Sequence, residues 1–421
     1  MSDARWLTLL CASRLSFGFI FMAYSGAVSV LMGAWSMSAG QAGLISSGWY
    51  AGYLISLFIA GILSDRIGAK RTFLGMSVAA CASAFLFAAF ADSFLSAILL
   101  YALAGLCSGG SYTTGLTLIA ERFEPARRGS AMGWFLAASS LGYALALFMA
   151  GAVLAFGGWR AWFFATAAGP LIGAAIATQV LAQTKNIVLP HRRGIGGMRV
   201  FVAVFRNKPA MLAIWSYAFH SWELLGLWAW LPAFVAAAAT REHGATAAVG
   251  IASVLSGITF ITNAAGSVAG GKLSDRIGRP SVMLMMTLVS VACSLAFGWL
   301  FAAPLWILTI VAIVYNLTAL GDSSVYSSAL TELVPPHCLG AAYSLRSVLG
   351  YGLGAVSPLA FGLVLDVVSR FSGGRGTLAW GSAWLVLGIG ALPGLAAIFR
   401  LRKLGANGVG EPTPLAVKGS G

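Results

Sequence analysis

The sequence predicts an all-α membrane protein with twelve transmembrane helices in two pseudo-symmetric six-helix halves. Composition is the first reason: 59% of the 421 residues are hydrophobic and 9% are charged, whereas soluble domains carry roughly 25% charged residues. Apolar runs of about 20 residues, long enough to cross a bilayer, follow one another along the chain. The third reason is a repeat, because GILSDRIG at 61–68 returns as GKLSDRIG at 271–278. A phrase that recurs after half the chain length indicates two related halves.

The apolar runs form two sets of six. A basic segment that contains Pro190 and three glycines separates the sets, and we expect it to lie on the membrane surface as a linker. The end of the chain is rich in Gly and Pro, so we expect it to be disordered. The predicted organisation is an N-terminal half, a linker, a C-terminal half and a tail, at 1–182, 183–208, 209–403 and 404–421. The spans are expected near 6–32, 41–63, 72–91, 94–120, 130–156, 161–182, 209–239, 247–271, 281–301, 305–332, 339–367 and 378–401.

The net charge of +14 is distributed unevenly across the predicted spans. Twenty of the 26 Lys and Arg residues fall on the side that holds both termini, and four fall on the other side. An excess of basic residues marks the cytoplasmic side of a membrane protein. We therefore interpret the charge as a topology signal and not as a nucleic-acid surface. The expected location is a bacterial inner (plasma) membrane, with both termini in the cytoplasm.

The remaining composition excludes other classes of protein. The first apolar segment is too long for a signal peptide, so we expect it to stay as the first helix. The sequence shows no nucleophile–base pair and no metal-ligand cluster, so we expect no enzyme activity, no cofactor and no metal. The cysteines have no metal-type spacing, and we expect packing residues without a disulfide. They are Cys11, Cys81, Cys107, Cys293 and Cys338.

The repeated phrase resembles a family motif. The chain resembles the major facilitator superfamily, in which the loop between helices 2 and 3 carries G-x-L-x-D-R-x-G-x-[RK]-[RK], and the resemblance covers residues 6 to about 401. It implies a monomeric secondary transporter whose two halves rock about a central cavity. The matching positions that we assign to a cytoplasmic gate are Gly61, Asp65, Arg66, Gly68 and Arg71 in the first copy and Gly271, Asp275, Arg276, Gly278 and Arg279 in the second.

The resemblance implies a role for these gate loops. A carboxylate there can meet the N-terminus of a helix in the opposite half and stabilise the outward-facing state. The resemblance implies this for Asp65 and, in weaker form, for Asp275; the alternative is that the loops only set topology. Two features of proton-coupled drug exporters are absent, because Tyr101 stands in place of a helix-4 arginine and helix 5 lacks the Gly-Pro signature. Both absences count against a multidrug antiporter.

Ionisable residues within the predicted spans are the first candidates for function, since each costs roughly 2.5–3.5 kcal/mol to insert. They are Arg14, His220, Glu223, Asp322 and Arg346. The helical rise places Asp322 and Arg346 at similar depths, so we expect that they can form an ion pair. A pair between Arg14 and Glu223 would have to cross a larger offset. The structural alternatives are a salt bridge without a transport role, an Arg14 that snorkels to headgroups, and a neutral, hydrogen-bonded His220.

Amide and aromatic side chains accompany these charges. Asn263 lies in the eighth span. Three tryptophans near Glu223 can wall a substrate pocket; they are Trp222, Trp228 and Trp230. The alternative for Trp228 and Trp230 is an aromatic belt at the outer leaflet. The tyrosines that we consider for cavity lining are Tyr24, Tyr112, Tyr217 and Tyr326.

The preferred hypothesis is proton-coupled symport of a small organic anion. Arg14 and Arg346 would bind the anionic group, and Glu223 or Asp322 would take the proton. The alternatives are a proton-coupled exporter of amphipathic or cationic compounds and a membrane sensor or scaffold that does not transport. The expected partners are a small-molecule substrate, protons and the lipid bilayer, without nucleic acid. The residues expected at the substrate and proton sites are Arg14, Tyr24, His220, Glu223, Asn263, Asp322 and Arg346.

Overall fold

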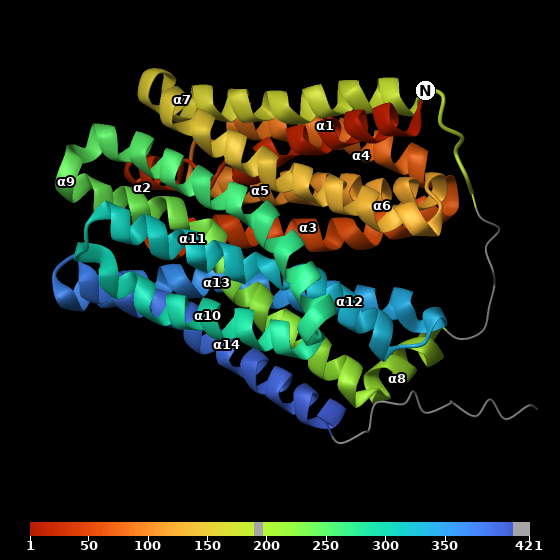
Figure 1. The fold of residues 1–421 in the computed structure, drawn as a ribbon. Helices are drawn as coiled ribbons and strands as arrows, with labels where there is room; N and C mark the ends of the chain where they lie inside the picture. Colours follow the sequence, from red (N-terminus) through yellow and green to blue (C-terminus); the bar gives the residue numbers. More distant parts are fainter. Residues whose placement is uncertain (189–196, 407–421) are drawn as a thin grey trace, which may run out of the picture.

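The computed structural model describes residues 1–188 and 197–406, and this part of the chain is helical without strands (Figure 1). The predicted tail from residue 407 on and the middle of the predicted linker lie outside the described residues, whereas residues 404–406 of the predicted tail continue the last helix. The first half contains α1 (Asp3–Met22), α2 (Val28–Ala34), α3 (Ala39–Ile67), α4 (Ala69–Phe90), α5 (Phe94–Ser108), α6 (Gly110–Arg122) and α7 (Pro125–Leu181). The second half contains α8 (Gly197–Arg206), α9 (Lys208–Ile277), α10 (Arg279–Phe297), η1 (Gly298–Ala302), α11 (Leu305–Gly321), α12 (Ser323–Leu333), η2 (Pro336–Cys338), α13 (Leu339–Ser372) and α14 (Thr377–Ala406).

Two very long helices each cross the membrane twice. Within the described residues, 11 helices are long and apolar enough to span a bilayer, and one of these candidates is the 55-residue stretch 127–181 of α7. At 1.5 Å per residue this stretch is about 80 Å long, which exceeds the roughly 30 Å hydrocarbon core. Its backbone turns at Gly158 (φ 69°), and α9 turns in the same way at Gly244 (φ 75°). The 11 candidates already count α9 as two spans, 208–245 and 247–277. Dividing α7 at its turn therefore gives the twelve predicted crossings.

The repeated phrase forms the same turn in both halves. Gly68 joins α3 to α4 with φ 90° and ψ 151°, and Gly278 joins α9 to α10 with φ 89° and ψ 148°. A positive φ of this size is readily adopted only by glycine. The sequence repeat therefore corresponds to a structural repeat at the predicted position.

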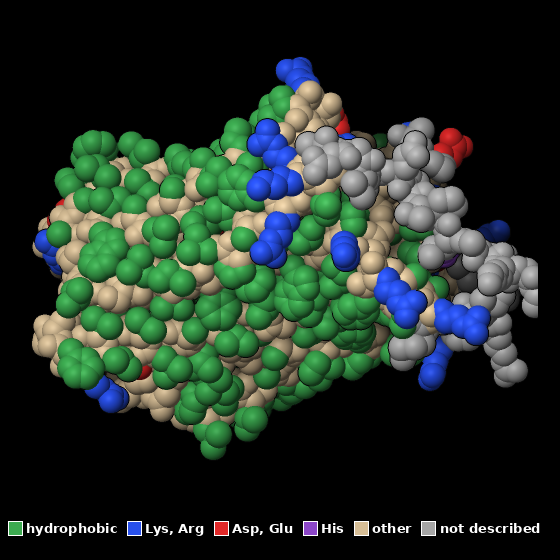
Figure 2. All heavy atoms as spheres, turned by 90° about the horizontal axis from the view of Figure 1, so that it is seen from below, with side chains coloured by type: hydrophobic (Ala, Val, Ile, Leu, Met, Phe, Trp, Pro, Cys, Tyr) green, Lys and Arg blue, Asp and Glu red, His purple; other side chains and the backbone are tan. Residues whose placement is uncertain are grey.

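The two halves lie side by side with their helices roughly aligned (Figure 1). One end of the bundle carries the N-terminus, both motif turns and the last residues of α14, and we call it the motif end. The opposite end, with the turns at Gly158 and Gly244, is called the far end. Figure 2 shows Lys and Arg gathered toward the motif end of one face, while hydrophobic side chains cover most of the remainder. This distribution is that of a lipid-facing surface with a basic end.

The halves are joined closely at the far end. The backbone amides of Ala39 and Gly40, at the start of α3, donate to the two carboxylate oxygens of Asp366 in α13, at 2.8 and 2.7 Å. Next to this contact, a Cβ on Gly43 would meet the backbone carbonyl of Pro358, and one on Gly362 would meet that of Ala39. Small residues let membrane helices approach to this distance.

The middle and the motif end differ from the far end. In the middle, the hydroxyl of Tyr50 donates to the carbonyl of Leu225 at a long 3.5 Å. Among the described residues, this bond and the two to Asp366 are the only hydrogen bonds between the halves. Asp65 and Arg66 at the motif end are exposed. The described structure is thus closed at the far end and not bonded at the motif end.

Close packing within the first half leads to a stability prediction. A Cβ on Gly142 of α7 would collide with the backbone of Leu15 in α1, whereas Gly133 of the same helix has open space around it. Gly142→Ala is expected to lower the free energy of unfolding by about 1–3 kcal/mol, because backbone atoms cannot move aside as a side chain can. Thermal unfolding in detergent measures this, with Gly133→Ala as the matched control. Equal melting temperatures for the two variants would contradict the packing argument.

Candidate substrate and proton sites

Arg14 is buried within the first half, and the groups around its guanidinium are uncharged. Its Nε donates to Ser139 Oγ at 2.7 Å and its Nη1 donates to Ser111 Oγ at 3.3 Å. The guanidinium carbon lies 5.1 Å from the ring centre of Tyr112 and 5.7 Å from that of Phe135. No carboxylate of the described residues lies within 4 Å of it. The side chain is held inside the bundle, so the alternative of snorkelling to headgroups does not describe this structure.

Arg346 in α13 is the corresponding cation of the second half. Its Nη1 donates to Ser327 Oγ at 2.6 Å. Its guanidinium lies over the rings of Tyr217 and Tyr343, at 4.5 and 5.1 Å from their centres. Like Arg14, it has no carboxylate within 4 Å among the described residues. Both cations are therefore positioned by hydroxyls and aromatic rings, which leaves their charge available to an anion.

The predicted ion pair between Asp322 and Arg346 is wrong. Asp322 instead lies next to His220, whose Nε2 is 3.5 Å from Asp322 Oδ1. The helical rise gives the depth of each residue in the membrane, but it does not determine the face of the helix from which the side chain projects. Asp322 turns toward α10, where Thr287 donates to its Oδ2 at 3.4 Å, and Arg346 turns toward Ser327. The Arg14–Glu223 pair is also not formed.

Tyrosines lie next to both arginines. Tyr112 of α6 contacts Arg14, and Tyr217 and Tyr343 contact Arg346. Tyr53 of α3 and Tyr351 of α13 pack across the two halves with ring centres 5.4 Å apart. Tyr112 and Tyr217 were considered from the sequence, whereas Tyr53 and Tyr351 were missed. Their position in the middle of the second and eleventh spans was the signal that could have identified them.

The two buried carboxylates lie apart from the arginines, inside the second half. Glu223 and Asp322 are both fully buried. Ser290 Oγ donates to Glu223 Oε2 at 3.1 Å, and Ser290 is one helical turn from Thr287, the donor to Asp322. The second oxygen of each carboxyl group, Glu223 Oε1 and Asp322 Oδ1, has no hydrogen-bond partner in the described structure. An ionised carboxylate is costly in such a place, so these groups are suited to carry a proton.

His220 connects the arginine region to the carboxylates. Its ring packs against two tyrosines, with centres 5.9 Å from Tyr217 and 5.5 Å from Tyr326, and these two tyrosine rings are themselves 5.6 Å apart. Tyr217 is also the ring below Arg346. Contacts therefore run without interruption from Arg346 through Tyr217 and His220 to Asp322. This path joins a cation to a buried acid of the same half.

The remaining predicted positions are buried in the packing of the helices. Tyr24 packs against Tyr101 within the first half, with ring centres 5.5 Å apart. Asn263 is fully buried, and its amide has no partner in the described structure. Trp228 packs against Phe21 of the other half at 5.9 Å. Trp230 is buried against Phe361, so the interpretation of Trp228 and Trp230 as an interfacial belt is wrong.

The two motif loops make different contacts. In the second half, Arg279 pairs with Asp275 and also with Glu332 Oε1 at 3.1 Å. In the first half, Asp65 has no ion-pair partner among the described residues, and Asn186 from the start of the linker binds the loop instead. Its Nδ2 donates to the carbonyl of Ile67 at 2.7 Å, and its Oδ1 accepts from the amide of Arg71 at 3.2 Å.

Comparison with known proteins agrees with this architecture. A sequence profile described as Major Facilitator Superfamily matches residues 10–240, which is more than half of the chain. The chain belongs to this superfamily. It is therefore a membrane transporter and not an enzyme.

Curated relatives of this superfamily member include transporters of small organic compounds. The "Hexuronate transporter" of Bacillus subtilis (strain 168) is 25% identical over 356 residues, which cover 80% of this chain and 82% of that protein. The "Probable 4-methylmuconolactone transporter" of Cupriavidus pinatubonensis is 26% identical over 379 residues, with coverages of 85% and 83%. Among solved structures, the nucleoside transporter NupG aligns with a TM-score of 0.71 and 16% identity, over 94% of this chain and 99% of that one. The last similarity supports the fold alone.

Proposed function

We propose that the protein is a proton-coupled symporter of small organic anions. The observation that carries the proposal is the pair of buried or half-buried guanidinium groups, Arg14 in the first half and Arg346 in the second, each held by aromatic rings and serine hydroxyls and without a carboxylate partner among the described residues. Such a pair can bind one anion between the halves. A relative named as a transporter of hexuronate, a sugar carboxylate, is in accord with this chemistry.

The orientation follows from charge. Because the Lys and Arg residues gather at the motif end (Figure 2), we assign this end to the cytoplasm. The structure then represents the state in which the halves are closed toward the outside. In the opposite state, Asp65 would take up the contact with the second half that the superfamily resemblance implies.

Proton coupling is assigned to Asp322 and Glu223. Asp322 communicates with Arg346 through His220 and Tyr217, so a change in charge at Arg346 when an anion binds can alter the proton affinity of the acid. Glu223 is connected to the same helix face through Ser290. The two acids are outside the arginine region, so the anion does not displace the proton directly. Coupling acts through the second half.

Proteoliposomes that contain a pH dye test this function. Pools of small organic acids are added outside to the wild type, Glu223→Gln and Asp322→Asn, with the exposed Glu124→Gln as the control. We expect the acids to acidify the lumen in the wild type and in the control, and at least one of the two buried-acid variants to abolish the signal. Hydrophobic amines form the comparison pool. A response to amines alone, with an alkaline lumen, would establish an exporter and reject anion symport.

A further inference from the structure

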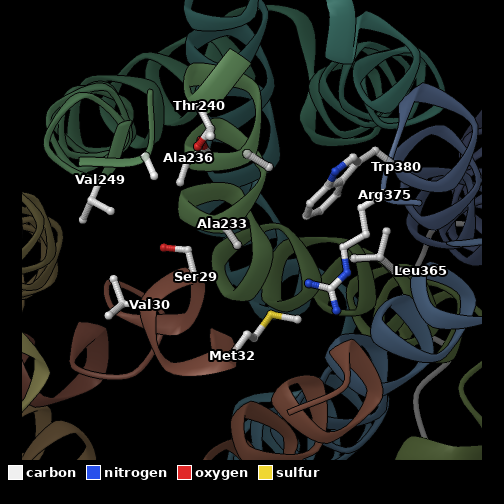
Figure 3. Close-up of a pocket in the computed structure, with 12 residues that line it drawn as sticks. Ser29, Val30, Met32, Ala233, Ala236, Thr240, Val249, Leu365, Arg375 and Trp380 are labelled. Atoms are coloured by element: carbon white, nitrogen blue, oxygen red, sulfur yellow. The ribbon is translucent and has the colours of Figure 1, made fainter. Parts of the chain in front are cut away.

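A cavity lies at the far end of the bundle, at the seam between the halves. Its volume is about 340 Å³, which is at the lower end of the roughly 300–1,000 Å³ of small-molecule sites. Figure 3 shows α2 of the first half on one side and helices of the second half on the others. The residues used below are Met32, Ala233, Ala236, Leu365, Arg375 and Trp380.

The wall of this cavity is mostly apolar, with Ser29, Thr240 and Arg375 as its polar residues. Alanines of α9, Met32, Leu365 and Trp380 supply most of the lining, and Arg375 is its charged residue. Arg375 precedes α14, and in Figure 3 its guanidinium extends into the space toward Met32. An apolar wall with one cation is complementary to an anion that has an apolar body.

Arg375 has capacity for a ligand. Its Nη2 lies 3.8 Å from Asp366 Oδ1, beyond hydrogen-bond distance. Both oxygens of Asp366 already accept backbone amides of Ala39 and Gly40. A guanidinium has five N–H donors. The side chain of Arg375 is 43% exposed, so a ligand can reach it from the far side of the membrane.

The geometry points to a second anion site in this cavity, distinct from Arg14 and Arg346, for an amphipathic organic monoanion such as an aryl carboxylate. The carboxylate binds Arg375, and the aromatic body packs against Met32, Ala236 and Trp380. This inference does not depend on the identity of the transported substrate. It concerns the outer seam and applies to an exporter as well as to a symporter.

The position of the site predicts its effect. Its walls belong to both halves, so opening of the far end separates Met32 from Ala233 and Ala236 and removes the cavity. A ligand that binds only the closed form stabilises that form by mass action. Occupancy from outside therefore inhibits transport and is not relieved by excess substrate.

Calorimetric titration of the purified full-length chain with 2-naphthoate tests the site. We expect binding to the wild type and to the double variant Arg14→Gln/Arg346→Gln, at least tenfold weaker binding to Arg375→Gln, and no binding of the neutral 2-naphthamide. Arg375→Lys retains the charge and should recover part of the affinity. Binding that is lost in the double variant and kept in Arg375→Gln would place naphthoate at the central arginines and overturn the inference. Absence of binding to the wild type would overturn it as well.

A second variant guards against an indirect effect of Arg375 on the fold. Ala236→Leu fills the cavity from α9 without touching Arg375, and it should also weaken 2-naphthoate binding at least tenfold. Its melting temperature without ligand reports whether the chain is folded. Folded Ala236→Leu with unchanged affinity would show that naphthoate does not occupy this cavity.

Discussion

Replacing Arg346 by glutamine is expected to weaken uptake of an organic anion about 10- to 100-fold. Glutamine can still donate to Ser327, so the local packing of α12 and α13 is retained, but the charge is lost. A hydrogen bond to a charged group contributes about 1.5–3 kcal/mol, and each 1.4 kcal/mol corresponds to a factor of about ten in affinity. Initial rates of uptake over a range of substrate concentrations measure the effect.

Two further variants locate the anion more closely. Arg14→Gln is expected to weaken uptake to a similar degree, because Arg14 is the corresponding cation of the first half and also lacks a carboxylate partner among the described residues. Arg370 lies on the same helix as Arg346 but is exposed at the far end, and Arg370→Gln should leave uptake unchanged. Normal uptake by Arg14→Gln together with a loss in Arg346→Gln would reduce the site to a single anchor. Normal uptake by both would reject the arginine pair as the binding site.

The fold could be predicted from the sequence because its signals are local and repeated. Apolar length determines a membrane span without reference to neighbouring helices. Gly68 and Gly278 occur at equivalent places in a repeated phrase, and they adopt the same positive φ. These properties belong to short segments, so no knowledge of tertiary contacts was needed to infer them.

The site was predicted only in part because it depends on which face of each helix meets which neighbour. The sequence identified Arg14, Arg346, Glu223 and Asp322 by the cost of charge in a membrane. It could not show that Asp322 turns toward His220 rather than Arg346. That choice depends on helix rotation, which is set by packing against other helices and carries no local signature.

The far-end contact was missed for the same reason. Asp366 lies near the end of a predicted span, where a carboxylate is unremarkable. Its importance arises only because the start of α3, 326 residues away in sequence, meets it with two unpaired amides. These amides belong to the first turn of a helix, where no intrahelical acceptor exists and the helix dipole favours a negative charge.

Asp366→Asn is accordingly expected to shift the conformational equilibrium about 10- to 100-fold toward a form with an open far end. Asparagine has one acceptor oxygen in place of two and no charge, so it loses the charge-assisted bonds to Ala39 and Gly40, which contribute about 1.5–3 kcal/mol each. Spin labels at Phe156 and Phe371 can measure the shift. Both side chains are strongly exposed, at 93% and 88%, and each lies close to the far end of a different half.

Pulsed electron resonance on the cysteine-free, doubly labelled chain should show a larger fraction of long distances in Asp366→Asn than in the parent. Glu242→Gln changes another exposed carboxylate at the far end and should not alter the distribution. Asp65→Asn should act in the opposite sense, because Asp65 has no ion-pair partner in the present state and would engage the second half only when the far end opens. On this expectation, the two carboxylates would hold opposite ends of α3 in alternate states. An identical distance distribution in Asp366→Asn and the parent would show that helix packing at Gly43 and Gly362, and not the carboxylate, keeps the far end closed.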